Sequence, residues 1–120
     1  TGTVPNQTTQ GATKFLRALS INSILKNADY TITPADPSWL IAQGTTPRTF
    51  TLPDATLVDG RIQCVSGNGA ATTHTVQVDG GTSNFMFDGT TPTSVTLPAY
   101  ETWCWLASDT VAGQWHRIAP

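Results

Sequence analysis

The sequence predicts an all-β fold, an antiparallel β-sandwich of jelly-roll type with an internal two-fold repeat. Three observations predict it. Threonine, whose branched Cβ suits a pleated strand, is abundant along the chain. Short apolar stretches recur about every ten residues, with turn residues between them. One phrase also occurs twice, as GTTPRTFTLP at 44–53 and GTTPTSVTLP at 89–98.

The domain is expected to span residues 28–120, preceded by an N-terminal arm and a helical segment at 1–27. Residues 1–11 carry almost no apolar side chain, so we expect an extended arm that becomes ordered only on a neighbouring protein. The attachment positions expected in the arm are Thr3, Val4, Pro5 and Asn6.

Residues 12–28 (ATKFLRALSINSILKNA) form the one candidate helix. Apolar side chains fall near helical spacing there, at Phe15, Leu16, Leu19, Ile24 and Leu25. Ile21 lies off this stripe, and serine and asparagine weaken the helical propensity of the second half. The alternation in LSINSIL (19–25) fits a strand equally well, so that alternative stays open for the second half.

From residue 28 onward the pattern predicts a succession of short strands. They are DYTIT (29–33), SWLIAQ (38–43), RTFTL (48–52), GRIQCVS (60–66), THTVQV (73–78), NFMF (84–87), TSVTL (93–97), TWCWLAS (102–108) and QWHRI (114–118). Asp-Gly pairs at 59–60, 79–80 and 88–89 favour tight turns between them. Pro53 and Pro98 each end a strand, because proline cannot donate to the strand ladder.

The duplicated phrase belongs to a longer repeat. SWLIAQGTTPRTFTLP (38–53) aligns without a gap with SNFMFDGTTPTSVTLP (83–98), and a shorter following loop brings Cys64 and Cys104 to corresponding places. We expect two such units to pack face to face around one core. The predicted core residues are Ile32, Leu40, Phe50, Leu52, Ile62, Val76, Phe85, Val95, Leu97, Trp105 and Ile118.

Two predicted strands are apolar on both faces. In residues 102–107, Trp103 and Trp105 point to one side while Cys104 and Leu106 point to the other. An antiparallel sandwich standing alone should have one polar face, so something must cover the second face. A helix covers only one patch, and we therefore favour a subunit interface. The predicted interface residues are Phe85, Phe87, Trp103 and Trp105.

Composition excludes several partners. The formal charge is −2, charged residues make up 12% of the chain, and the six Lys and Arg are too few for a basic nucleic-acid surface. No apolar run approaches the ~20 residues that cross a bilayer. We expect neither nucleic acid nor membrane as a partner.

Candidate catalytic and metal-binding residues form no convincing group. Cys64 and Cys104 lack zinc-site spacing, and we expect two small buried side chains, with a disulfide as the alternative. His74 shares parity with inward-facing valines, and His116 has no carboxylate cluster nearby. Most carboxylates stand in turns, and no G-x-S-x-G nucleophile motif occurs. We expect no enzymatic activity, cofactor or metal.

The aromatic side chains allow a second hypothesis. Rings can stack on sugar faces, although such residues more often fill a core or an interface. The candidates for a sugar platform are Tyr30, Trp39, Tyr100, Trp103, Trp105 and Trp115.

Four short motifs carry a resemblance to a known family. YTIT at Tyr30–Thr33, TLPDA at Thr51–Ala55, GRI at Gly60–Ile62 and WHRI at Trp115–Ile118 resemble the small β-domains of tailed-bacteriophage virion proteins, which include head-decoration, head-fibre and tail-fibre modules. The resemblance covers about residues 28–119, and the duplicated phrase and the helix-like segment depart from it.

The resemblance implies a non-enzymatic structural protein of the virion, a capsid decoration or fibre protein. It implies a homotrimer that is made and assembled in the host cytoplasm and lies on the virion surface beside partners such as the major capsid protein. The alternative is a receptor-binding tail-fibre module that binds a host surface glycan.

Overall fold

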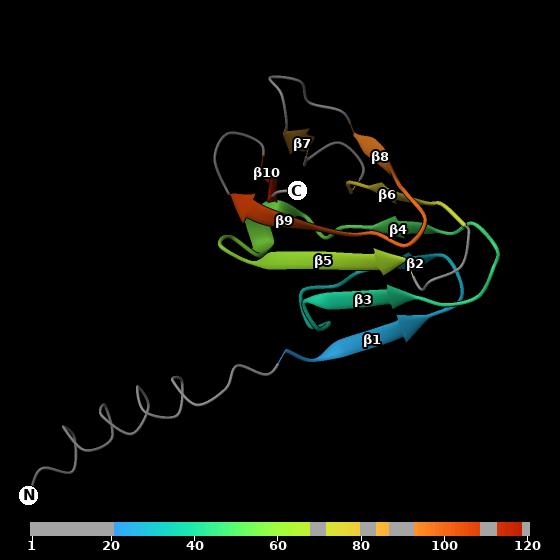
Figure 1. Cartoon of the computed structure of the whole chain (residues 1–120). Helices are drawn as coiled ribbons and strands as arrows, with labels where there is room; N and C mark the ends of the chain where they lie inside the picture. The colour runs from blue at the N-terminus through green and yellow to red at the C-terminus, as the bar shows by residue number, and fades with distance from the viewer. Residues whose placement is uncertain (1–20, 68–71, 80–83, 87–92, 109–112, 119–120) are drawn as a thin grey trace, which may run out of the picture.

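The computed structural model describes residues 21–67, 72–79, 84–86, 93–108 and 113–118. It consists of two mixed β-sheets packed face to face (Figure 1). The larger sheet has the order β1 (Ser23–Lys26), β3 (Trp39–Ala42), β5 (Ile62–Gly67), β9 (Thr102–Ser108), β10 (Gln114–Ile118) and β7 (Asn84–Met86). The smaller sheet has the order β2 (Tyr30–Thr31), β4 (Thr49–Thr51), β6 (His74–Gln77) and β8 (Ser94–Leu97).

The chain crosses from one sheet to the other after each of its first eight strands. As a result β1, β3 and β5 are parallel neighbours in one sheet, and β2, β4 and β6 are parallel neighbours in the other. Strand β8 is antiparallel to β6, and β9 is antiparallel to both β5 and β10. Strand β7 is parallel to β10. The prediction of an all-β fold is confirmed, but the prediction of antiparallel sheets is wrong. Turn residues mark where a strand ends and leave open whether the chain returns as a hairpin or crosses to the other sheet.

In the described part of the candidate helix the strand alternative holds, and the helix prediction is wrong there. Ser23–Lys26 forms strand β1, and residues 12–20 lie outside the described residues. Pairing with β3 satisfies the backbone of this weakly helical sequence, and it brings Ile24 against the core. Strand β1 therefore belongs to the sandwich, which begins before the predicted boundary at residue 28. The helical element of the described chain is a short 3-10 turn, η1 (Ala55–Leu57), whose start is capped by the Asp54 carboxylate.

The core lies between the two sheets. Seven of the predicted core side chains are buried there, namely Ile32, Leu40, Phe50, Leu52, Val76, Leu97 and Trp105. Val95 is half-buried against them, and the Phe85 side chain lies outside the described part. Ile62 and Ile118 were wrongly predicted, since they remain 48% and 37% exposed on the opposite side of the larger sheet. Trp115 was missed; it is fully buried, and its indole Nε1 donates to the Pro53 carbonyl at 3.0 Å.

The two copies of the sequence repeat make the same crossing between the two sheets. Strands β3 and β4 cross from the larger to the smaller sheet, and β7 and β8 do the same. However, the corresponding pairs differ, since β2 is parallel to β4 whereas β6 is antiparallel to β8, so the two halves are not superimposable copies. What the halves share is a buried leucine before a proline, Leu52 and Leu97.

Replacing either of these leucines with alanine should lower the free energy of unfolding by about 2–5 kcal/mol, because a fully buried side chain leaves a cavity. Chemical denaturation of Leu52→Ala and Leu97→Ala measures this. Leu57→Ala, at a side chain that is 69% exposed, is the control and should change little. A loss below about 1 kcal/mol at either buried site would contradict the matching core roles.

Candidate functional site

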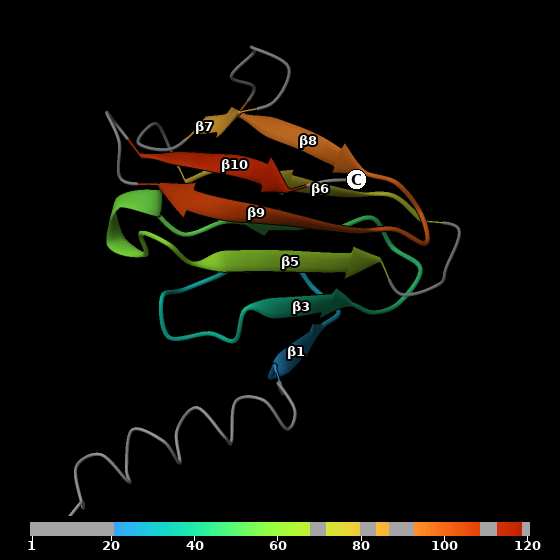
Figure 2. The same cartoon turned by 60° about the vertical axis from the view of Figure 1, so that its left-hand side comes forward.

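The outer face of the larger sheet is the most unusual surface of the described chain. Side chains two apart in a strand share a face, and so do registered neighbours on adjacent strands. The register therefore places one set of apolar residues together on the side away from the core. This outer face consists of Leu25, Trp39, Ile41, Ile62, Cys64, Cys104, Leu106 and Ile118, with Ser23, Ser66, Thr102, Ser108, Gln114 and His116 between them. Figure 2 shows its central strands β3, β5 and β9 side by side.

A disulfide lies at the centre of the outer face. Cys64 and Cys104 are directly opposite each other in antiparallel strands β5 and β9, with their Cα atoms 4.1 Å apart. The expectation of two unbonded buried cysteines is therefore wrong, and the alternative holds. The sequence placed both residues at corresponding strand positions, but it did not show that these two strands are neighbours.

Three polar side chains beside the disulfide bond to one another. The Trp39 indole Nε1 donates to the Ser66 hydroxyl at 2.7 Å, and that hydroxyl lies 2.7 Å from the Thr102 hydroxyl. Four apolar side chains of this face are exposed, namely Leu25 (56%), Ile62, Leu106 (38%) and Ile118. Trp39, Ile41 and Cys104 are half-buried, and Cys64 is buried at 4% exposure. A shallow, mostly apolar pocket of about 310 Å³ opens where Ile21, Trp39 and Ile62 meet.

The two outer surfaces of the sandwich differ sharply in polarity. At its described strand positions the outer face of the larger sheet holds no Lys, Arg, Asp or Glu. The outward positions of the smaller sheet are instead hydroxyl and amide side chains, namely Thr31, Thr49, Thr51, Thr75, Gln77, Ser94 and Thr96. The smaller sheet thus has the polar face expected of a sandwich in water, and the larger sheet does not.

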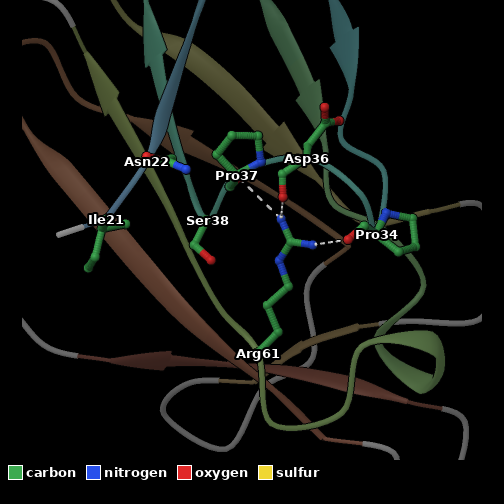
Figure 3. Close-up of a pocket in the computed structure, with 7 residues that line it drawn as sticks. All are labelled: Ile21, Asn22, Pro34, Asp36, Pro37, Ser38 and Arg61. Carbon is green, nitrogen blue, oxygen red and sulfur yellow. Dashed lines mark hydrogen bonds between the residues drawn. The ribbon is translucent and has the colours of Figure 1, made fainter. Parts of the chain in front are cut away.

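Beside the outer face, Arg61 anchors the connection between β2 and β3 (Figure 3). Its guanidinium donates to the carbonyls of residues 33, 34, 36 and 37 at 2.7–3.3 Å, and to the Gln63 amide oxygen. Burial lowers the pKa of Arg61, yet a guanidinium stays charged at neutral pH. Its donors are all engaged, so the neighbouring pocket of about 430 Å³ offers no free cation to an anionic ligand.

Asp36 stabilises the same connection from its other side. Its carboxylate accepts from the Tyr30 hydroxyl at 2.7 Å and from the Thr33 backbone at 2.8 Å. Burial alone would raise the pKa of Asp36, but these hydrogen bonds and the charge of Lys26 outweigh it, and the pKa is lowered. The same hydrogen bond raises the pKa of Tyr30. Asp36 is thus an ionised structural group and not a proton donor.

His74 faces inward, as its parity predicts. It is 3% exposed, packs with its ring centroid 5.6 Å from that of Phe50, and accepts a hydrogen bond at Nδ1 from the backbone of Arg48. Burial, reinforced by the charge of Arg48, lowers the pKa of His74. The imidazole is therefore neutral at pH 7 and fixes the start of β4 to β6.

Two of the four predicted interface residues lie on the core side of the larger sheet. Trp105 is fully buried, and Trp103 lies half-buried on the core side of β9 under the Arg117 guanidinium. The parity argument placed these two tryptophans on one face correctly. Trp105 is the core residue that was predicted, and its burial is incompatible with its prediction as an interface residue. The side chains of Phe85 and Phe87 and the arm residues Thr3, Val4, Pro5 and Asn6 lie outside the described part.

Within the described residues, no group of three or more His, Cys, Asp and Glu could hold a metal ion. None of the helical turns described is long and apolar enough to cross a membrane. The chain matches no family model, no curated protein and no solved structure.

The free energy of unfolding should fall as the pH drops from 7 to 5. In the unfolded chain His74 takes up a proton near its ordinary pKa of about 6.5. In the folded chain the pKa of His74 is lower, so the same protonation occurs only at a lower pH. This one group contributes a slope of at most about 1.4 kcal/mol per pH unit. Denaturation of His74→Asn across this range should show a shallower dependence than that of the native chain. Equal slopes in the His74→Asn variant and the native chain would contradict the assignment.

Loss of the disulfide should cost about 2–4 kcal/mol, because the bond joins residues 40 positions apart and restricts the unfolded chain. Denaturation of the Cys64→Ala/Cys104→Ala variant measures this. A reducing agent should destabilise the native chain by a similar amount and leave the double variant unaffected. A native chain indifferent to reductant would argue against the bond.

Proposed function

We propose that this chain is a non-enzymatic structural protein of a tailed-bacteriophage virion, a capsid decoration or fibre protein that assembles as an oligomer on the particle. One observation carries the proposal, the uncharged apolar outer face of the larger sheet. Chains that act alone in water rarely expose such a surface, whereas subunits of an assembly bury it against a partner. The resemblance of the strand and turn motifs to virion β-domains adds the biological setting.

The chemistry of the described groups supports a structural role. The described groups with a shifted pKa are Tyr30, Asp36, Arg61 and His74. Of these, Arg61, Asp36 and His74 are each held by a hydrogen bond with the backbone. Paired acid and base groups that face a common cavity would favour catalysis, but these three residues stabilise connections between strands.

The disulfide also suits a particle that works outside the cell. Thiols in a bacterial cytoplasm are kept reduced, and structural disulfides persist in oxidising surroundings. In a chain made and assembled in the host cytoplasm, the Cys64 and Cys104 thiols would form the bond after the particle leaves the cell. They would give up two electrons and two protons to an extracellular oxidant such as dioxygen. The covalent link between β5 and β9 then stabilises the fold on the virion surface.

The glycan-binding alternative has less support. Trp105 and Trp115 are fully buried and cannot stack on a sugar. Tyr100 is 64% exposed but lies in a turn, while Trp39 is half-buried on the outer face. These rings form no aromatic platform comparable to the apolar surface beside them.

Deleting residues 1–11 should abolish attachment to undecorated capsids of the phage that encodes the chain. An arm with almost no apolar side chains gains order only on another surface, and its loss removes those contacts. Co-sedimentation of the full and the shortened chain with such capsids measures this. The shortened chain must keep the unfolding curve and native mass of the full chain. If the shortened chain is folded and still attaches fully, the role of the arm is contradicted. If the full chain attaches to neither capsids nor tails, the proposed function is contradicted.

A further inference from the structure

We infer that the outer face of the larger sheet packs against the same face of a second copy of this chain. The inference rests on the proposed function and names the partner of that surface. The geometry suits a sheet-on-sheet contact, because the face is formed by regular strands whose side chains project from a common surface. Its polar groups at Trp39, Ser66 and Thr102 already bond to one another, so burying them leaves few hydrogen bonds unmade.

Charge favours an identical partner over a foreign one. Partners of different sequence are usually selected by complementary charges, and this face has no Lys, Arg, Asp or Glu at its described strand positions. An uncharged face meets its own copy without like-charge repulsion. Closed pairing of identical patches is also the commonest arrangement of soluble oligomers.

The size of the face sets the strength of the contact. Strands stand about 4.8 Å apart and rise about 3.3 Å per residue, so five strands of about five residues cover roughly 24 by 17 Å. Two such faces bury roughly 800 Å² together, which is the size of a weak, reversible interface. The disulfide lies near the middle of this area and Trp39 beside it, and aromatic side chains are enriched at the centres of interfaces.

The chain itself has too little apolar sequence to cover the face. Residues 12–20 hold three large apolar side chains, Phe15, Leu16 and Leu19, among the charges of Lys14 and Arg17. The outer face has apolar side chains on each of the strands β1, β3, β5, β9 and β10. A second copy supplies an equal apolar surface, which the N-terminal segment cannot.

The decisive positions are Ile62 and Leu106, a registered pair on β5 and β9 that is 48% and 38% exposed. A lysine at either position would have to be desolvated in the contact, which costs several kcal/mol per ion. Because both side chains are accessible in the single chain, lysine should leave its fold intact. Thr75 and Thr96 are the matched control, an outward registered pair on antiparallel strands of the smaller sheet.

The experiment is sedimentation equilibrium of the full chain and of the single variants Ile62→Lys, Leu106→Lys, Thr75→Lys and Thr96→Lys over a wide concentration range. We expect the native chain and both threonine variants to associate, and both outer-face variants to associate about 100-fold more weakly or worse. Circular dichroism and an intact disulfide confirm that each variant is folded. A native mass of two copies that is lost in both outer-face variants supports the inference, because identical faces that meet each other form a closed pair.

Two results would overturn it. The first is a native chain that stays monomeric at all concentrations, and removal of residues 1–20 then shows whether that segment occupies the face. The second is folded outer-face variants that associate like the native chain.

Capsid attachment separates this inference from the proposed function. A chain that attaches to capsids without self-association refutes the inference alone, and one that self-associates through this face without attaching to any part of the virion refutes the proposed function alone.

Discussion

The antiparallel pairing of β5 with β9 determines which side chains face each side of the larger sheet. It sets Cys64 opposite Cys104 and Gln63 opposite Trp105, and the disulfide holds this register covalently. Because side chains alternate along a strand, a slip of one residue would turn Trp105 toward water and Leu106 toward the core. The buried core and the apolar outer face are therefore two consequences of one register.

The strands on either side of this pair are held by contacts between distant segments. The early strands cross repeatedly between the sheets, so their connections are longer than hairpin turns. Arg61 binds four carbonyls of the β2–β3 connection, and His74 accepts from the backbone at the start of β4. Buried or half-buried polar side chains thus replace the backbone hydrogen bonds that a tight hairpin would supply.

The contrast between the two outer surfaces links the fold to its proposed role. Threonines on the smaller sheet present hydroxyl groups to water, and the larger sheet presents isoleucine, leucine, tryptophan and a disulfide. A sandwich with one polar and one apolar surface has a defined orientation in an assembly, with the apolar surface toward a partner and the polar one toward solvent. That polarity is the property a subunit of a virion needs, and it requires no catalytic group.

The sequence by itself determined the features that depend on near neighbours in the chain. The all-β class, the positions of most strands, the buried Leu52 and Leu97, and the opposite orientation of Trp105 and Leu106 all follow from alternation and turn residues. Only the tertiary structure decided which side of β9 faces the core, that β5 and β9 pair through Cys64 and Cys104, and that Ser23–Lys26 is a strand. These features depend on contacts between segments far apart in the chain, such as the bond from Trp115 to the Pro53 carbonyl. A pattern with a period of two residues contains no information about strand direction or about which face is covered.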